Sequence, residues 1–244
     1  MRWIYLSPHL DDAVLSAGGW IHEQTQAGNK VEIWTIMCGD PHLTEYSPFA
    51  QRLHFRWGFS SAEETVRMRR EEDRTAAAIV GATTVHFDFL DCIYRRAPKG
   101  EWLYDEISVP PHEADTSYPA QIAEAILSRL LPDDQIVCQL ALGSHVDHVL
   151  VRQAAELLGR SLRYTIDIPY WLGQPSGFDA RAAGMRESVF RITEPSLGCW
   201  IEAALAYPSQ LPTLGEGFET PEKAAKSIRN YWEEREGIRI LQFG

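Results

Sequence analysis

Short apolar segments alternate with segments of helical periodicity along this chain. The apolar segments are RWIYLS, VEIWTIMC, TVHFDFL, QIVCQL and YTIDIPY. Between them lie longer stretches whose apolar residues recur every three or four positions. Strands and helices that alternate in this way are typical of βαβ units. We therefore expect an α/β fold, a Rossmann-like, doubly wound and mostly parallel sheet with helices on both faces.

The predicted helices have recognisable ends. The first begins near Asp11 and ends at Gly28, and Ser61 with Glu64 forms a capping box at the start of SAEETVRMRREEDRTAAAIVG. After Tyr170 the pattern is weaker. It predicts a strand in ESVFRIT and helices in SLGCWIEAALAY and TPEKAAKSIRNYWEEREG. Because no repeat or linker divides the chain, we expect one domain over residues 1–244, with a motif-bearing core at about 2–160 and a more weakly patterned part at 161–244.

Two connections, at about 39–60 and 92–117, are longer than ordinary loops of such folds. Each follows the carboxyl end of a predicted strand, which is where open α/β sheets bind their ligands. They contain Trp57 and Trp102, which can either stack on a sugar ring or pack within the loops. We predict that both connections form walls of a substrate site.

Composition excludes several classes of protein. A formal charge of −11 and a pI near 5.2 argue against a nucleic-acid partner, which usually meets a basic face. No apolar run reaches the roughly 18 residues of a membrane span, and the first residues lead directly into a strand, so we expect a cytoplasmic protein without a membrane span. The four cysteines form no CxxC pair and are predicted to be buried free thiols. A small-molecule partner is expected, and a homo-oligomer is left open.

Two clusters of potential metal ligands follow the first and fourth predicted strands. They are His9, Asp11 and Asp12 in PHLDDA, and His145, Asp147 and His148 in HVDH. In a doubly wound sheet these two strands are commonly neighbours, so we expect the clusters to meet. Taken alone, the aspartates are typical helix caps and the second cluster is ambiguous. Together they offer two imidazoles and a carboxylate, the ligand set of an open zinc site.

The adjacency of Asp11 and Asp12 has a geometric explanation. Successive residues at the start of a helix point about 100° apart. Asp12 can therefore face a metal while Asp11 reaches the water beside it.

The paired motifs resemble those of the PIG-L/LmbE-like family of zinc-dependent N-deacetylases, whose first motif is usually HPDDE and whose second is HxDH. The intervening helix is also similar, because Arg69, Glu72 and Gly81 match an R-x-x-E helix that ends in glycine. The FLD segment that ends at Asp91 resembles the family's next strand end. The resemblance covers roughly residues 2–160.

This resemblance implies a role for each motif residue. The implied ligands of one zinc ion per chain are His9, Asp12 and His148. The implied catalytic residues are Asp11 as general base, His145 as the imidazolium or hydrogen-bond donor that faces the oxyanion, and Asp147, which orients His145. The implied substrate-binding residues are Arg69, for sugar hydroxyls, and Asp91.

Three positions depart from the family pattern. Leu10 replaces a proline and Ala13 a glutamate, which removes a contact behind the metal ligands. Gly143 stands where some relatives carry a tyrosine that helps the oxyanion. We expect the metal site to be intact. We expect the oxyanion site either to have fewer hydrogen-bond donors or to be completed from a long loop.

The resulting hypothesis is a zinc-dependent hydrolase that removes the N-acetyl group from an amino sugar or sugar conjugate of the N-acetylglucosamine type. One alternative is an amidase that cleaves a bulkier acyl group. Another is an inactive domain that binds metal or sugar, an alternative suggested by the departures at Ala13 and Gly143. The presence of Asp11 argues against the inactive form, because a structural zinc does not need a free carboxylate beside its water.

Overall fold

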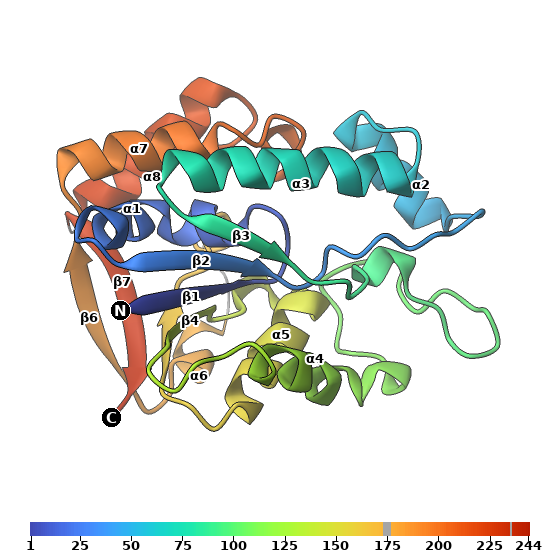
Figure 1. Ribbon diagram of the computed structural model, residues 1–244. Helices are drawn as coiled ribbons and strands as arrows, with labels where there is room; N and C mark the ends of the chain where they lie inside the picture. The colour runs from blue at the N-terminus through green and yellow to red at the C-terminus, as the bar shows by residue number, and fades with distance from the viewer. Residues whose placement is uncertain (173–176, 235) are drawn as a thin grey trace.

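The computed structural model describes residues 1–172, 177–234 and 236–244, in which seven strands form one sheet in the order β3-β2-β1-β4-β5-β7-β6 (Figure 1). The strands are β1 (Arg2–Ser7), β2 (Lys30–Thr35), β3 (Thr83–His86), β4 (Gln135–Gln139), β5 (Leu162–Thr165), β6 (Met185–Arg191) and β7 (Gly237–Phe243). The first five are parallel, and β7 pairs antiparallel with both β5 and β6. The predicted doubly wound, mostly parallel sheet is confirmed. β1 lies between β2 and β4, so the first and fourth strands are neighbours as expected.

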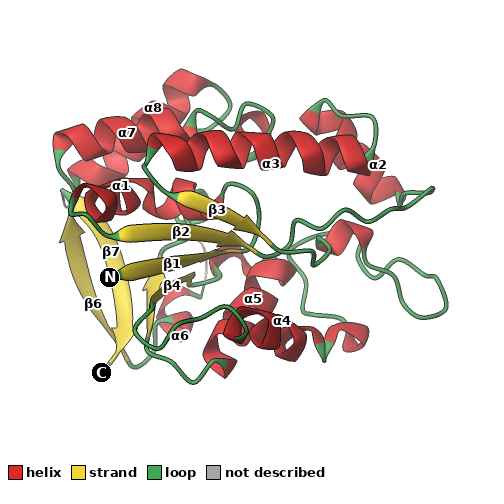
Figure 2. Ribbon diagram, in the orientation of Figure 1, coloured by secondary structure: helices red, strands yellow, loops and turns green. Residues whose placement is uncertain are grey.

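Helices cover both faces of the sheet (Figure 2). On one face lie α1 (Asp12–Gln26), α3 (Ala62–Ile79), α7 (Glu194–Ala204) and α8 (Pro221–Glu233), and on the other α4 (Tyr118–Leu127), α5 (Val146–Leu157) and the short α6 (Phe178–Arg181). The helix α2 (Pro48–Trp57) lies beyond the carboxyl ends of the strands. None of the helices in the described part of the chain is long and apolar enough to cross a membrane.

Side chains of β1 show how the two cores arise. Trp3 and Tyr5 belong to the core beneath α1, α3, α7 and α8, whereas Ile4 and Leu6 belong to the core beneath α4 and α5. Successive residues of a strand point to opposite faces, so a strand covered on both sides must be apolar throughout. The continuous apolar segments of the sequence are therefore the buried strands.

Three elements differ from the sequence expectation. The connection at 39–60 contains α2, which Ser47 caps by accepting a hydrogen bond from the backbone N–H of Ala50. α4 was not foreseen, and neither was β7, because the predicted final helix ends at Glu233 and the chain then returns as a strand. The connection at 92–117 contains only two short 3-10 turns, η1 (Cys92–Tyr94) and η2 (Glu113–Asp115).

Candidate metal-dependent active site

A cavity of about 230 Å³ opens at the carboxyl ends of the central strands. Seven of the predicted site residues line it, namely His9, Asp11, Asp12, Arg69, Asp91, His145 and His148. Of the predicted site residues, only Asp147 is absent from the wall, since it lies fully buried behind it. The structure therefore brings the two sequence clusters together, as the strand order requires.

In the loop between β1 and α1, the Asp11 carboxylate is not used to cap the helix. The hydroxyl of Ser7 accepts the backbone N–H of Ala13 at 3.0 Å, and it thereby caps the start of α1. The side chain of Asp11 makes no capping hydrogen bond. Asp12 Oδ2 accepts the backbone N–H of His9 at 2.8 Å, which fixes the loop and aims the Asp12 carboxylate at the histidines. The capping interpretation of Asp11 is therefore not needed.

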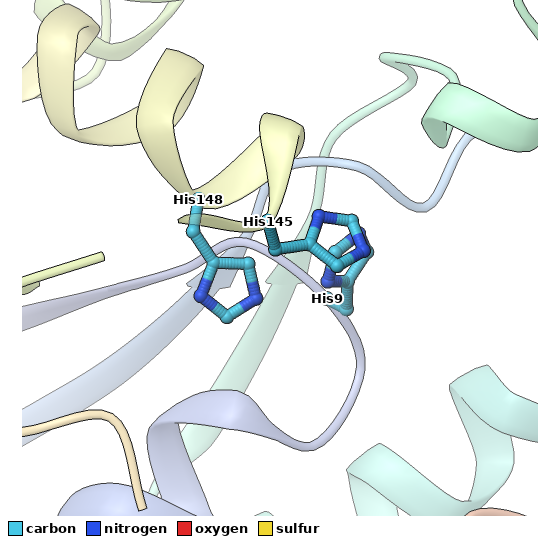
Figure 3. A group of neighbouring side chains, drawn as sticks. All are labelled: His9, His145 and His148. Atoms are coloured by element: carbon cyan, nitrogen blue, oxygen red, sulfur yellow. The ribbon is translucent and has the colours of Figure 1, made fainter. Parts of the chain in front are cut away.

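The second cluster lies at the start of α5. His145 is the residue before the helix, and Asp147 and His148 are in its first turn. The backbone N–H of Val146 donates to the carbonyl of Ile107 at 2.8 Å, which attaches the connection at 92–117 to this turn. The three imidazoles of the site gather here, and one nitrogen of each lies within 4.8 Å of one nitrogen of the others (Figure 3).

Asp12 faces two of these imidazoles. Its Oδ2 atom lies 3.3 Å from His9 Nδ1 and 3.2 Å from His148 Nε2. The other ring nitrogens meet carboxylates as well: His9 Nε2 lies 3.0 Å from Asp147 Oδ2, and His148 Nδ1 lies 3.1 Å from Asp167 Oδ1. A carboxylate behind each imidazole is the usual arrangement around a metal-binding histidine, because it orients the ring and raises its basicity.

The pKa values follow from these contacts. Burial alone would lower the pKa of His148, but Asp12 and Asp167 outweigh it and raise the pKa to about 9. Burial likewise opposes charge on Asp12, yet the charge of His148 and hydrogen bonds to His148 and His9 hold the pKa of Asp12 well below its usual value. The site thus favours an anionic Asp12 that faces two basic imidazoles.

The donor set fits a divalent metal. Two imidazoles and one carboxylate, with further carboxylates behind the rings, are typical of zinc sites that keep a position open for water or substrate. His145 is less suited to be a ligand through Nδ1, because that atom accepts the backbone N–H of Asp147 at 3.2 Å. His9, His145 and His148 form a candidate metal group, and with Nδ1 of His145 engaged, the geometry favours His9, Asp12 and His148 as the residues that could hold a metal.

Asp11 has the properties of a group that exchanges protons near neutrality. Burial and the neighbouring charge of Asp12 raise the pKa of Asp11 to about 7, although Arg69 opposes the shift. Arg69 Nη2 lies 3.8 Å from Asp11 Oδ2. A general base works best when its pKa lies near the working pH, so Asp11 is well placed to take and return a proton.

His145 is expected to be either an imidazolium or a hydrogen-bond donor. Burial and then the charges of His9 and His148 hold the pKa of His145 well below its usual value. Since Nδ1 accepts a backbone N–H, the ring proton belongs on Nε2. The surroundings of His145 therefore favour a neutral hydrogen-bond donor over an imidazolium.

The partner of Asp147 also differs from the expectation. Its carboxylate contacts His9 through Oδ2, accepts the backbone N–H of Cys92 at 2.9 Å, and pairs through Oδ1 with Arg95 Nη2 at 2.6 Å. Only its backbone N–H meets His145. Asp147 therefore orients His9 with its side chain and His145 with its main chain.

Arg69 and Trp57 form one wall of the cavity. Both line it, and the guanidinium of Arg69 lies 4.9 Å from the centre of the Trp57 ring. Arg69 is 7% exposed, and its Nε atom has no hydrogen-bond partner among the described residues. Asp91 lines the cavity too, but its Oδ1 atom caps η1 and its Oδ2 atom lies 3.7 Å from His9 Nε2. Trp102 lies outside the wall, under the guanidinium of Arg96.

The C-terminal part supplies a wall that the sequence did not suggest. Gln210, Thr213 and Leu214 line the cavity. Glu72, which was noted only for its motif position, holds this segment by accepting the backbone N–H and the hydroxyl of Ser209 at 3.0 and 2.6 Å. No sequence pattern marks these residues.

Two further site residues follow β5. Asp167 supports His148, and Tyr170 lines the cavity with its ring 5.6 Å from the His148 ring. Burial and the charges of Asp12 and Asp167 hold the pKa of Tyr170 well above its usual value, so the phenol keeps its proton. An aspartate inside the apolar segment YTIDIPY was the available signal, because a buried carboxylate needs a partner.

The contact expected to be missing at Ala13 has a substitute. Ala13 is buried in the core, and Leu10 is buried as well. Gln139 Nε2 donates to the carbonyl of Asp12 at 3.0 Å and to the Ser16 hydroxyl at 2.9 Å. The end of β4 therefore holds the first motif in place.

Comparison with known proteins agrees with this geometry. The family model for PIG-L, described as GlcNAc-PI de-N-acetylase, matches residues 4–158, which is more than half of the chain. The chain belongs to the PIG-L family. The predicted family and its reaction class, hydrolytic N-deacetylation, are thereby confirmed.

PIG-L relatives of known structure match along almost the whole chain. A deacetylase from the biosynthesis pathway of teicoplanin is 29% identical, with a TM-score of 0.85 over 99% of this chain and 97% of that chain. The zinc-inhibited form of teicoplanin deacetylase is 28% identical, also with a TM-score of 0.85 and the same coverage. Among curated PIG-L relatives, the 2'-N-acetylparomamine deacetylase of Niallia circulans is 24% identical over 89% of this chain and 84% of its own length.

Proposed function

We propose that this PIG-L protein uses one zinc ion per chain to remove the N-acetyl group from an amino sugar that forms part of a larger conjugate. The observation that carries the proposal is the pair of carboxylate-backed imidazoles facing Asp12, with the free carboxylate of Asp11 beside them. The relatives support it, because they are deacetylases of teicoplanin biosynthesis and of 2'-N-acetylparomamine.

Asp11 moves the proton in this reaction. His9, Asp12 and His148 would hold the metal, which when bound would polarise the amide carbonyl and would lower the pKa of water from 15.7 to about 7. Asp11 takes a proton from the attacking water while the water oxygen bonds to the carbonyl carbon. When the C–N bond breaks, Asp11 returns that proton to the leaving nitrogen, and the products are acetate and a free amine.

His145 stabilises the charge that develops on the carbonyl oxygen. Its Nε2–H is the donor left over once Nδ1 has accepted the Asp147 backbone N–H. Because its pKa lies well below the usual value, it donates as a neutral imidazole rather than as a cation. A donor fixed before the reaction costs no reorganisation in the transition state.

The cavity favours a small acyl group. Its volume of about 230 Å³ lies below the ~300–1,000 Å³ of pockets that enclose drug-sized ligands. An acetyl group and part of one sugar ring therefore account for the enclosed space, and the rest of the conjugate lies outside. The guanidinium of Arg69 lines the cavity, where it can donate to sugar hydroxyls, and the Trp57 ring lies beside it. No observation favours the amidase for bulkier acyl groups.

The test separates the two aspartates. Metal content and acetate release from a panel of N-acetylglucosamine conjugates are measured for wild type, Asp12→Ala and Asp11→Asn. Wild type should hold about one zinc ion per chain, and Asp12→Ala should lose both metal and activity. Asp11→Asn should keep the metal and lose turnover by roughly 10²- to 10⁴-fold, the usual contribution of a general acid–base.

Asp88→Asn is the matched control, because this carboxylate is exposed and pairs with Arg70 away from the cavity wall. It should change neither quantity. A wild-type protein that takes up no divalent metal contradicts the mechanism, and loss of metal from Asp11→Asn means that the roles of the two aspartates are exchanged.

A further inference from the structure

The segment that follows β5 is fixed against the site. The backbone N–H of Ile168 donates to the Ser16 hydroxyl at 3.2 Å, and Asp167 contacts His148. The backbone N–H of Trp171 then donates to the carbonyl of Asp167 at 2.9 Å, which closes a turn around Tyr170. The position of Tyr170 is thus set by the same elements that position the metal ligands.

Gly143 leaves the space that the Tyr170 ring occupies. A Cβ atom at Gly143 would lie 2.1 Å from Tyr170 Cδ1 and 2.7 Å from Cε1 and Cγ, so the two could not coexist. Gly143 also has a φ of +74°, in the left-handed region that favours glycine. The turn before α5 is therefore shaped to admit an aromatic ring from the β5 segment.

Tyr170 and His145 pack against the same imidazole. The His148 ring centre lies 5.0 Å from that of His145 and 5.6 Å from that of Tyr170. Both residues line the cavity. The Arg69 guanidinium, in contrast, lies beside Asp11, where the water must be activated.

The Tyr170 hydroxyl is a donor that makes no hydrogen bond within residues 1–172, 177–234 and 236–244. Tyr170 is one of the residues that line the cavity. Other donors of the wall are engaged: Trp57 Nε1 donates to the Thr213 hydroxyl at 3.3 Å, and Gln210 Nε2 donates to the Ser209 hydroxyl at 2.8 Å. The Tyr170 proton is therefore left for a ligand in the cavity.

We propose that Tyr170 is a catalytic residue whose phenol O–H hydrogen-bonds the carbonyl oxygen of the scissile amide alongside His145. This inference rests on the proposed function. The phenol keeps its proton throughout, while the proton of the water passes to Asp11 and from there to the leaving nitrogen. The hydrogen bond strengthens as negative charge develops on the oxygen, so it accelerates the reaction rather than only binding substrate.

Tyr170→Phe tests the proposal, since it removes the hydroxyl and keeps the ring beside Gly143. We expect kcat for acetate release to fall by about 10²- to 10³-fold, the usual cost of one oxyanion donor, with KM and metal content unchanged. Tyr164→Phe is the control, because its hydroxyl lies 3.4 Å from Glu156 and is outside the cavity wall. It should retain wild-type kcat.

A second measurement separates catalysis from packing. A phosphonate analogue that carries a tetrahedral oxyanion should bind Tyr170→Phe about as much more weakly as kcat falls, whereas the deacetylated amine product should bind equally well. A loss confined to KM and product affinity would overturn the proposal and make Tyr170 a sugar contact. Unchanged kcat in an active wild-type background would overturn it too, whereas a wild type that releases no acetate contradicts the proposed function itself.

Discussion

The two histidines that face Asp12 are supported in different ways. Each uses one ring nitrogen toward Asp12 and the other toward a buried carboxylate, Asp147 for His9 and Asp167 for His148. The distance from ring nitrogen to carboxylate oxygen is nearly equal in the two pairs, 3.0 Å for His9 and Asp147 and 3.1 Å for His148 and Asp167. Their surroundings are not equal.

Asp147 takes part in a network of charged side chains with His9 and Arg95, whereas Asp167 has His148 as its charged partner. Burial alone would raise the pKa of Asp147, but the Arg95 guanidinium and His9 outweigh it and hold the pKa below its usual value. Burial raises the pKa of Asp167, and its Oδ2 atom has no hydrogen-bond partner among the described residues. The two histidines thus have similar geometry, but Asp147 behind His9 is firmly charged, whereas the charge of Asp167 behind His148 is less stabilised.

The largest difference should appear when each support is neutralised. Asp147→Asn leaves Arg95, which is 4% exposed, with Asp115 as its remaining carboxylate, and a buried ion pair broken on one side costs about 3–5 kcal/mol of the free energy of unfolding. Asp167→Asn should cost less, because His148 keeps Asp12 as a charged partner. Both should weaken metal binding by about 10- to 100-fold, the usual effect of a residue behind a ligand. Denaturant unfolding of metal-free protein and chelator competition measure the two quantities, and equal losses of stability contradict the comparison.

A pH series on the metal-free protein should show a smaller effect. The folded pKa of His148 is about 9, above the ~6.5 of an unfolded histidine. The corresponding stability is complete below pH ~6.5 and is lost as the pH rises through about 9, a change of about 3 kcal/mol. The raised pKa of His9 acts in the same direction.

Unfolding free energies at pH 6.5 and 9 check this prediction. Metal-loaded protein should not show the decline, because ligand imidazoles are neutral at both pH values. Asp167→Asn should flatten the metal-free decline by removing one source of the raised pKa. A decline of the same size in metal-loaded protein would assign it to other groups.

The smallest effect should come from Arg69→Ala, which touches neither support. It should lower kcat/KM for the best conjugate by about 10-fold, because a hydrogen bond from a charged group contributes about 1.5 kcal/mol or more. A minimal N-acetyl sugar that does not use this contact should be affected much less, and metal affinity should not change. Parallel kinetics on the two substrates decide this. Equal losses on both would mean that Arg69 shapes the metal site through Asp11.

Sequence reasoning identified the residues of the candidate metal site because they lie close together in two short segments. His9 and Asp12 share one loop, His145 and His148 share one turn of helix, and parallel strand order brings the two loops together. Asp147 was also found, because it lies in the same motif, but two other residues behind the site could not be found in this way. Arg95 and Asp167 lie in segments without motifs, and only packing in three dimensions gives each buried charge its partner.

The same distinction applies to the fold. The alternation of apolar and helical segments predicted the parallel part of the sheet, since the strands and the helix of each βαβ unit follow one another in the sequence. β7 was missed because it pairs antiparallel with two strands that precede it in the chain, β5 and β6, and its short sequence does not indicate those partners. The capping of α1 was likewise not predictable from residue type, because the hydrogen bond comes from Ser7 and not from Asp11 or Asp12.

The place of β7 also determines when the sheet can be completed during synthesis. Within the described part of the chain β6 pairs with β7 alone, so β6 has no strand to pair with until the residues after Gly237 have left the ribosome. The strands that carry the metal ligands are made much earlier and can pair first. A chain truncated before Gly237 should therefore assemble the catalytic edge while releasing β6 as an unpaired strand that invites association between chains.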